Sequence, residues 1–166
     1  MRLSIIIPVY NEKSTICAVL EKVRGIELPG IEKEIIVVDG CSTDGTRELL
    51  KDIAFKESIC LIMEEQRSGK GMAVCIGLRN ATGDILLIQD ADLETNPKEY
   101  PMLLEPILED KSRVVYGSRF KNGRGNATWS NYCGNQAVTF LMNMLFFCGL
   151  SDVATAYKVF RRDVIK

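Results

Sequence analysis

The segment Leu3-Ser4-Ile5-Ile6-Ile7-Pro8-Val9 is the part of this sequence that decides the fold. Its isoleucines stand at consecutive positions, so both sides of an extended strand would be hydrophobic there. The run Ile35-Ile36-Val37-Val38 has the same character. Strands that are apolar on both faces are typical of parallel sheets covered by helices on both sides.

Short apolar runs alternate with helical patterns on either side of these two segments. We expect strands at residues 3–9, 33–39, 58–64, 84–89 and 113–117, and helices at 14–24, 44–55, 68–80, 97–108 and from about 135. This alternation predicts an open, doubly wound α/β sheet, in which ligands bind at the carboxyl ends of the strands. The length of 166 residues fits a single domain spanning residues 1–166.

Polar side chains follow three of the expected strands, so we expect them to meet in one crevice. Tyr10-Asn11-Glu12 follow the first strand, Asp39-Gly40 the second and Asp90-Ala91-Asp92 the fourth. Carboxylates two positions apart in extended chain point to the same side and repel each other. Mg²⁺ or Mn²⁺ would relieve that repulsion and bridge the carboxylates to a substrate's phosphates. A solvated turn is the alternative, because aspartate is common in turns.

Composition excludes several classes of function. The chain has no histidine, which removes Ser/His/Asp and Cys/His nucleophiles and the zinc sites that depend on histidine. The remaining chemistry uses carboxylates, metal, lysine or arginine. With 21 basic and 22 acidic residues the net charge is −1, so we expect no nucleic-acid partner.

The cysteines and the apolar segments bear on the compartment. Six cysteines without C-x-x-C spacing indicate reduced thiols and a cytoplasmic protein. The first apolar segment is too short for the core of a signal peptide. The longest apolar stretch, residues 137–150, is interrupted by Thr139 and Asn143 and is shorter than the ~20 residues of a spanning helix. We expect a core or interfacial helix there.

Five motifs, in order along the chain, resemble the family 2 glycosyltransferases of the GT-A fold. They are residues 6–12, 37–46, 69–71, 90–92 and 116–120. The likeness is strongest to the dolichol- or polyprenyl-phosphate mannosyltransferase and glucosyltransferase branch. It implies a Rossmann-like, mostly parallel sheet with helices on both faces. It also implies a nucleotide-diphosphate sugar donor, GDP-mannose or a UDP-sugar, and a polyprenyl or dolichyl phosphate acceptor at the cytoplasmic face of a membrane.

The resemblance also implies which residues bind the donor. Its nucleotide-sugar site would comprise residues after the first, second and fourth strands, together with the lysine of the glycine-rich motif. These residues are Pro8, Tyr10, Glu12, Val38, Asp39, Lys70, Asp90 and Ala91. Asp39 would accept hydrogen bonds from the base, and Lys70 would have a supporting role, since the phosphate-loop pattern around it is incomplete.

Three further roles concern the phosphates and the metal. Asp90, Asp92 and Glu94 would hold Mg²⁺ or Mn²⁺, although the branch commonly has glutamine at position 94. Asp92 would be catalytic. Arg119 would be catalytic as well, because its guanidinium pairs well with phosphate oxygens. Lys158 would contact phosphate, in a segment that resembles D-x-x-T-G-Y-K-x-F with Ala156 in place of glycine.

The mechanism implied is an inverting single displacement at the anomeric carbon. A lipid phosphate acceptor is already anionic and needs no general base, whereas a sugar hydroxyl would need a carboxylate base. No residue of the sequence stands out as that base.

Other interpretations stay open. A phosphatase or phosphotransferase with an aspartate nucleophile also has Asp-x-Asp after a buried strand, but the continuation Leu93-Glu94-Thr95 differs from its pattern. A non-catalytic nucleotide-sugar-binding module, or a transferase to a saccharide hydroxyl, would use the same residues. The basic loop at 121–126 is either a lid or a long connection. The sequence ends at Lys166, so we expect a missing C-terminal segment or a membrane-anchored partner.

Overall fold

One six-stranded sheet organises the molecule, in the strand order β3-β2-β1-β4-β6-β5. The computed structural model describes residues 1–118, 129–147 and 149–165. The strands are β1 (Arg2–Val9), β2 (Glu32–Asp39), β3 (Cys60–Met63), β4 (Ile85–Ile88), β5 (Val114–Tyr116) and β6 (Lys158–Arg161). The helices are α1 (Ile16–Gly25), α2 (Thr46–Lys56), α3 (Lys70–Asn80), α4 (Tyr100–Leu108) and α5 (Trp129–Phe146), with single 3₁₀ turns at Pro97–Glu99 and Arg162–Val164.

The expected alternation of strand and helix is confirmed, with one strand that the sequence did not indicate. β6 pairs antiparallel with both β4 and β5 and lies between them. The expected strands at 84–89 and 113–117 are therefore parallel but not neighbours. Val159 in β6 is fully buried, which explains why this short segment forms a strand inside the sheet. The sheet is mostly parallel, as predicted.

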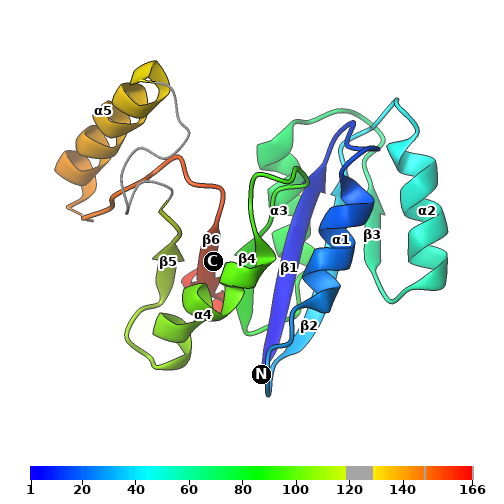
Figure 1. Ribbon diagram of the computed structural model, residues 1–166, viewed down its shortest axis with the longest axis horizontal. Coiled ribbons are helices and arrows are strands. Elements are labelled where there is room, and N and C mark those ends of the chain that lie inside the picture. Colours follow the sequence, from blue (N-terminus) through cyan, green and yellow to red (C-terminus); the bar gives the residue numbers. More distant parts are fainter. Residues whose placement is uncertain (119–128, 148, 166) are drawn as a thin grey trace.

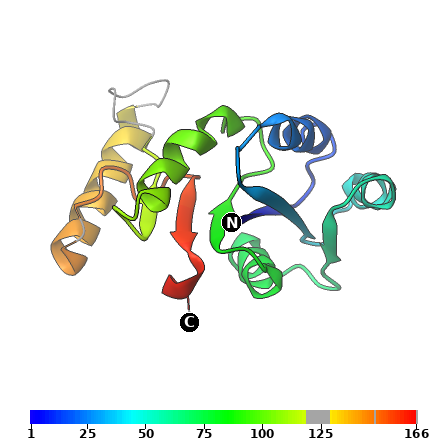
Figure 2. The same ribbon diagram turned by 90° about the horizontal axis from the view of Figure 1, so that it is seen from below.

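Helices cover both faces of the sheet, and the apolar strands pack against them in two clusters. On one face, alternate residues of the strands pack against α1, α2 and α4; this cluster includes Leu3, Ile5, Ile7, Val37 and Leu87. On the other face the remaining residues pack against α3; these include Ile6, Ile36, Val38 and Leu86. Figure 2 shows α1 and α3 on opposite sides of the strands. The two-sided apolar character of β1 and β2 is thus used in full.

The last helix, α5, lies beyond β5 at that end of the sheet (Figure 1, Figure 2). Asn135, Thr139 and Asn143 recur every four residues, so they share one side of the helix. They bond to the segment 150–153: Asn135 Nδ2 donates to Asp152 at 2.8 Å, Val153 N donates to Thr139 Oγ1 at 3.2 Å, and Asn143 exchanges two bonds of 2.7 Å with Leu150.

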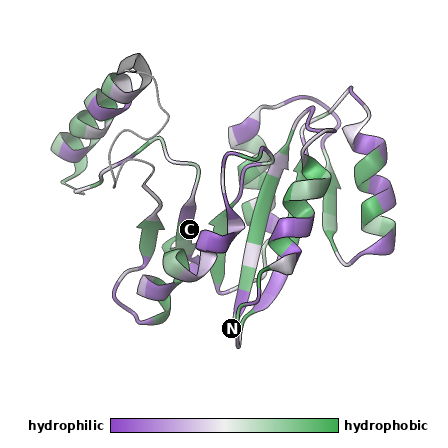
Figure 3. Ribbon diagram, in the orientation of Figure 1, coloured by the Kyte–Doolittle hydropathy of each residue, from purple (hydrophilic) through white to green (hydrophobic). Residues whose placement is uncertain are grey.

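The apolar side chains of α5 point away from the body of the protein. Phe140 is 70% exposed and Leu145 57%, and Figure 3 shows hydrophobic segments along this helix. Of the two expected roles, a core helix is therefore wrong, and an interfacial helix stays a prediction. The polar positions that interrupt the apolar stretch face inward because they have partners there. Across the described ranges, no helix combines the length and the apolar character needed to cross a membrane.

Candidate functional site

A buried glutamine fixes the turn that follows β4. Gln89 is fully buried, and its Nε2 donates to Asp90 O at 2.8 Å and to Thr95 Oγ1 at 2.5 Å. Its Oε1 accepts from the hydroxyl of Tyr100 in α4 at 2.8 Å. Both ends of the turn are thereby tied to one side chain. Gln89 was not among the predicted site residues, although it is a polar residue that ends an apolar run.

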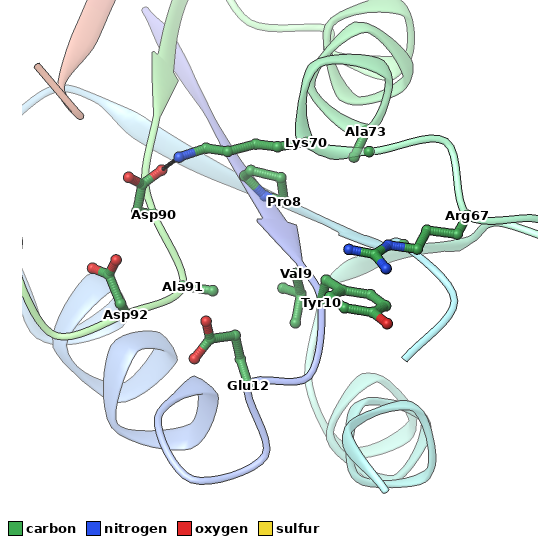
Figure 4. Close-up of a pocket in the computed structure, with 12 residues that line it drawn as sticks. Pro8, Val9, Tyr10, Glu12, Arg67, Lys70, Ala73, Asp90, Ala91 and Asp92 are labelled. Atoms are coloured by element: carbon green, nitrogen blue, oxygen red, sulfur yellow. Dashed lines mark ion pairs between the residues drawn. The ribbon is translucent and has the colours of Figure 1, made fainter. Parts of the chain in front are cut away.

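Asp90 and Asp92 both line one pocket, as their spacing predicted. Lys70, the first residue of α3, places Nζ 2.7 Å from Asp90 Oδ1, and the Asp90 side chain is only 15% exposed. Asp92 Oδ1 accepts from the backbone N–H of Glu94 at 3.0 Å. Figure 4 shows the two carboxylates on the same side of the pocket, with the Lys70 ammonium against Asp90. A carboxylate so little exposed is stabilised by a cation at this distance.

The pocket has a volume of about 220 Å³ and lies at the carboxyl ends of β1, β2 and β4. Its residues come from these strand ends and from the start of α3. They are Pro8, Val9, Tyr10, Glu12, Gly40, Arg67, Gly69, Lys70, Ala73, Asp90, Ala91 and Asp92. This is the expected position for a ligand in an open α/β sheet.

Tyr10 and Arg67 form the end of the pocket away from Asp90. The Arg67 guanidinium carbon lies 4.0 Å from the centroid of the Tyr10 ring, and Figure 4 shows the two groups stacked. Such a contact fixes the orientation of the Tyr10 ring and leaves the edge of the ring and the charge of Arg67 to interact with a ligand. Arg67 was not among the predicted residues, because nothing in its sequence neighbourhood shows that it would meet Tyr10.

The loop after β1 is tied to the loop after β2. Asn11 has a positive φ of 55°, and its backbone N–H donates to Ser42 Oγ at 2.9 Å. Its side-chain oxygen accepts from Thr43 N at 2.8 Å, and Glu12 N donates to Thr46 Oγ1 at 3.0 Å. A left-handed conformation at a non-glycine residue persists where surrounding contacts impose it. The position of the pocket residues on either side of Asn11 is fixed in this way.

Asp39 and Val38 lie behind the pocket and are not among its lining residues. Val38 is fully buried in the cluster against α3. Asp39 is fully buried, and its Oδ2 lies 2.7 Å from Arg47 Nε. The hydrogen bond to Asp39 raises the pKa of Arg47. The binding roles of Val38 and Asp39 stay predictions. In this structure Asp39 Oδ2 is directed to Arg47, and Asp39 Oδ1 accepts from Ser42 N at 3.3 Å.

A second, larger cavity adjoins the first through Lys70 and Asp90, which line both. Its volume is about 730 Å³, and Glu94 and Lys158 lie on its wall. Lys158 Nζ donates to the carbonyl of Thr155 at 2.5 Å. The structure therefore brings Lys158 to the same cavity as Asp90, although the two are far apart in the sequence.

The structure brings only some of the predicted metal ligands to one place. Asp92 lines the first pocket and Glu94 the second cavity, while Asp90 faces both. In the part of the chain that the structure describes, no three Asp, Glu, Cys or His side chains converge on one metal position. Two carboxylates on one wall still fit Mg²⁺ or Mn²⁺, because such ions take the rest of their oxygens from phosphates and water. Coordination by Glu94 stays a prediction.

Arg119, the other residue predicted to be catalytic, lies outside the described residues, as does the basic loop at 121–126. The remaining predicted residues of the nucleotide-sugar site, namely Pro8, Tyr10, Glu12, Lys70, Asp90 and Ala91, meet in the first pocket.

Comparison with known proteins agrees with this geometry. The sequence model of the family described as "Glycosyl transferase family 2" matches residues 4–166. A dolichol-phosphate mannosyltransferase of Pyrococcus furiosus is 33% identical over 132 residues, which are 80% of this chain and 37% of that protein. An undecaprenyl-phosphate 4-deoxy-4-formamido-L-arabinose transferase of Aeromonas hydrophila is 28% identical over 98% of this chain and 49% of that protein. The chain thus spans less than half the length of either relative.

Two solved structures are similar as well. Glucosyl-3-phosphoglycerate synthase from Mycobacterium tuberculosis, solved with Mn²⁺, UDP and phosphoglyceric acid, has a TM-score of 0.73 and 25% identity, over 98% of this chain and 56% of that one. A mannosyltransferase from Pyrobaculum calidifontis, solved with GDP-Man and Mn²⁺, has a TM-score of 0.51 and 36% identity, over 54% of this chain and 27% of that one. These similarities support the GT-A-like fold.

Proposed function

Since this chain belongs to glycosyl transferase family 2, we propose that it transfers a hexose from a nucleotide-diphosphate sugar to a polyprenyl or dolichyl phosphate. The observation that carries the proposal is the pocket in which Asp90 and Asp92 stand at one end and Tyr10 and Arg67 at the other. The first end suits a diphosphate with its divalent cation, and the second suits a nucleoside. The two curated relatives are a dolichol-phosphate mannosyltransferase and an undecaprenyl-phosphate arabinose transferase, which supports a lipid phosphate as acceptor.

The diphosphate end combines negative and positive groups from this chain. Asp90 and Asp92 would hold the cation, which when bound acts as a Lewis acid on the departing diphosphate. The Lys70 ammonium, 2.7 Å from Asp90, adds a positive charge at the same end. We expect it to stabilise the negative charge that develops on the leaving nucleoside diphosphate.

The second cavity offers a place for the acceptor, because it meets the donor pocket at Lys70 and Asp90. An oxygen of the acceptor phosphate attacks the anomeric carbon, and the new C–O bond forms as the bond to the β-phosphate oxygen breaks. The electron pair leaves with the nucleoside diphosphate, so the configuration is inverted. Lys158 on the cavity wall would attract the acceptor phosphate. With this acceptor the reaction would take place at a membrane surface.

A saccharide hydroxyl is the second candidate acceptor, and one observation favours it. Glu94 and Glu99 both line the second cavity, so a carboxylate base is available after all. A hydroxyl acceptor requires such a base, whereas a phosphate does not. The substitution Glu99→Gln would reduce transfer to a hydroxyl and leave transfer to a lipid phosphate unchanged.

Calorimetric titration with GDP, UDP and their mannose, glucose and N-acetylglucosamine conjugates, with and without Mn²⁺, tests the donor site. We expect metal-dependent binding of one nucleotide, and loss of that dependence in Asp92→Ala. Transfer to polyprenyl phosphate is then measured with the conjugate that binds. Absence of binding to every nucleotide would refute the donor site, and binding without transfer to any acceptor would indicate a binding module.

A further inference from the structure

Glu64 is a buried carboxylate with one oxygen that lacks a partner. It directly follows β3, and its side chain belongs to a residue only 8% exposed. One carboxylate oxygen, Oε1, accepts from the hydroxyl of Ser68, whereas Oε2 is buried and has no hydrogen-bond partner among the described residues. Buried polar atoms are nearly always paired, so an orphaned oxygen beside a pocket indicates a ligand that supplies the missing donor.

The orphaned oxygen lies beside Gly40, at the Tyr10 end of the donor pocket. Gly40 lines that pocket, and a Cβ built on Gly40 would lie 3.4 Å from Glu64 Oε2 and 3.9 Å from Tyr10 Cβ. Glu64 is not itself among the lining residues; Gly40, which has no side chain, adjoins both Oε2 and the pocket. The edge of a ring lying against Tyr10 would have to pass Gly40 to reach Oε2, and the lack of a side chain there leaves room for it.

The other buried carboxylate near this end, Asp39, already has partners on both oxygens. Its Oδ2 is engaged by Arg47 at 2.7 Å, and its Oδ1 accepts from Ser42 N at 3.3 Å. The backbone of Glu64 is held in place, since its N–H donates to Asp39 O at 3.0 Å and its carbonyl accepts from Arg47, and the carboxylate is held by the hydroxyl of Ser68. A fixed acceptor with a free oxygen can discriminate between ligands, because it cannot turn away from one that lacks a donor.

We infer that Glu64 selects the base of the donor by accepting a hydrogen bond from a ring N–H. Guanine and uracil share this group, at N1 and N3 respectively, whereas adenine and cytosine have an unprotonated ring nitrogen there. The inference rests on the proposed function, since it assumes that a nucleotide binds with its base against Tyr10. It assigns to Glu64 the role that the sequence suggested for Asp39.

The test measures binding of GDP, UDP, ADP and CDP, with Mn²⁺, to the wild-type chain and to Glu64→Met. We expect the wild type to bind GDP or UDP about ten- to a hundredfold tighter than ADP and CDP, as a hydrogen bond to a charged group provides. Comparison of the affinities for GDP and UDP shows whether guanine or uracil is the preferred base. Glu64→Met should lose the preference and keep its ADP affinity. Glu65→Met is the matched control, because Glu65 is the exposed neighbour.

Methylated ligands test the same bond without any change to the protein. 1-Methyl-GDP and 3-methyl-UDP lack the ring N–H, so the nucleotide that the wild type prefers should bind about ten- to a hundredfold more weakly when methylated. An undiminished affinity for the methylated nucleotide, or a base preference that survives in Glu64→Met, would overturn the inference while leaving the donor site intact. Failure of the wild type to bind any of the four nucleotides would instead refute the proposed function.

Discussion

The parallel half of the sheet and α5 use their apolar residues in opposite ways. Leu87 in β4 is fully buried in the cluster against α1, α2 and α4, whereas Leu145 in α5 is 57% exposed. In α5 the residues that face the body are the polar ones, held by hydrogen bonds to the segment 150–153. Hydrophobicity alone therefore does not decide which side of a helix is buried. The partners available on the neighbouring segment decide it.

A matched pair of leucines gives the largest expected contrast. Leu87→Ala removes a fully buried side chain, which costs about 2–5 kcal/mol of unfolding free energy through lost burial and the cavity left behind. Leu145→Ala removes a side chain that is already exposed, and surface changes of this kind stay within about 0.5 kcal/mol. Denaturant titration of both variants measures the difference. Equal losses would mean that the exposed side of α5 is covered in solution.

The buried pair of Asp39 and Arg47 is the next test of the parallel half. Arg47→Met leaves a fully buried carboxylate without its cation, which should cost about 3 kcal/mol of unfolding free energy. The double variant Asp39→Asn with Arg47→Met removes the charge as well, and it should recover part of that loss. A double variant no more stable than Arg47→Met would contradict this explanation. Thermal unfolding of the three proteins decides the matter.

Two helical glycines should respond in opposite directions. A Cβ at Gly77 in α3 would lie 2.3 Å from Ile6 Cγ2, so Gly77→Ala overpacks the core and costs about 1–3 kcal/mol. A Cβ at Gly134 in α5 would meet no other described residue within 4 Å, so Gly134→Ala should gain about 0.5–1 kcal/mol of helix stability. Gly71→Ala, also free of contacts, controls for α3 itself. Calorimetric melting temperatures would show whether the signs differ.

The smallest effect is expected where α5 is attached. Asn135→Ala removes the bond to the buried Asp152, which is worth about 1 kcal/mol. We expect faster amide hydrogen exchange in residues 132–146 and unchanged protection in β1 and β4. If protection falls equally in all of these elements, α5 and the sheet unfold as one unit.

Local patterns were sufficient for most of the strands and helices. β1 and β2 could be predicted because each carries consecutive apolar residues, and the positions of Tyr10, Asp90 and Asp92 followed because they come directly after strands. β6 could not be predicted in this way. It is short, and its burial depends on β4 and β5, which lie on either side of it.

The candidate site, too, could be predicted only in part from local patterns. The sequence placed Asp90, Asp92 and Lys70 near a ligand, but not the contact between Lys70 and Asp90. It also gave no reason to separate Asp92 from Glu94, which face different cavities. Short-range spacing fixes which side of a strand a residue occupies, whereas the walls of a cavity come from several loops.

The sequence by itself determined the class of fold, the order of most elements and the residues that stand at the strand ends, because these depend on periods of two to four residues. Only the tertiary structure decided the partner of each charged group. It directed Asp39 to Arg47, stacked Arg67 on Tyr10 and left one oxygen of Glu64 without a partner in the part of the chain that the structure describes. The physical reason is that an ion pair or an orphaned atom depends on side chains brought together from different elements, and no local pattern contains that information.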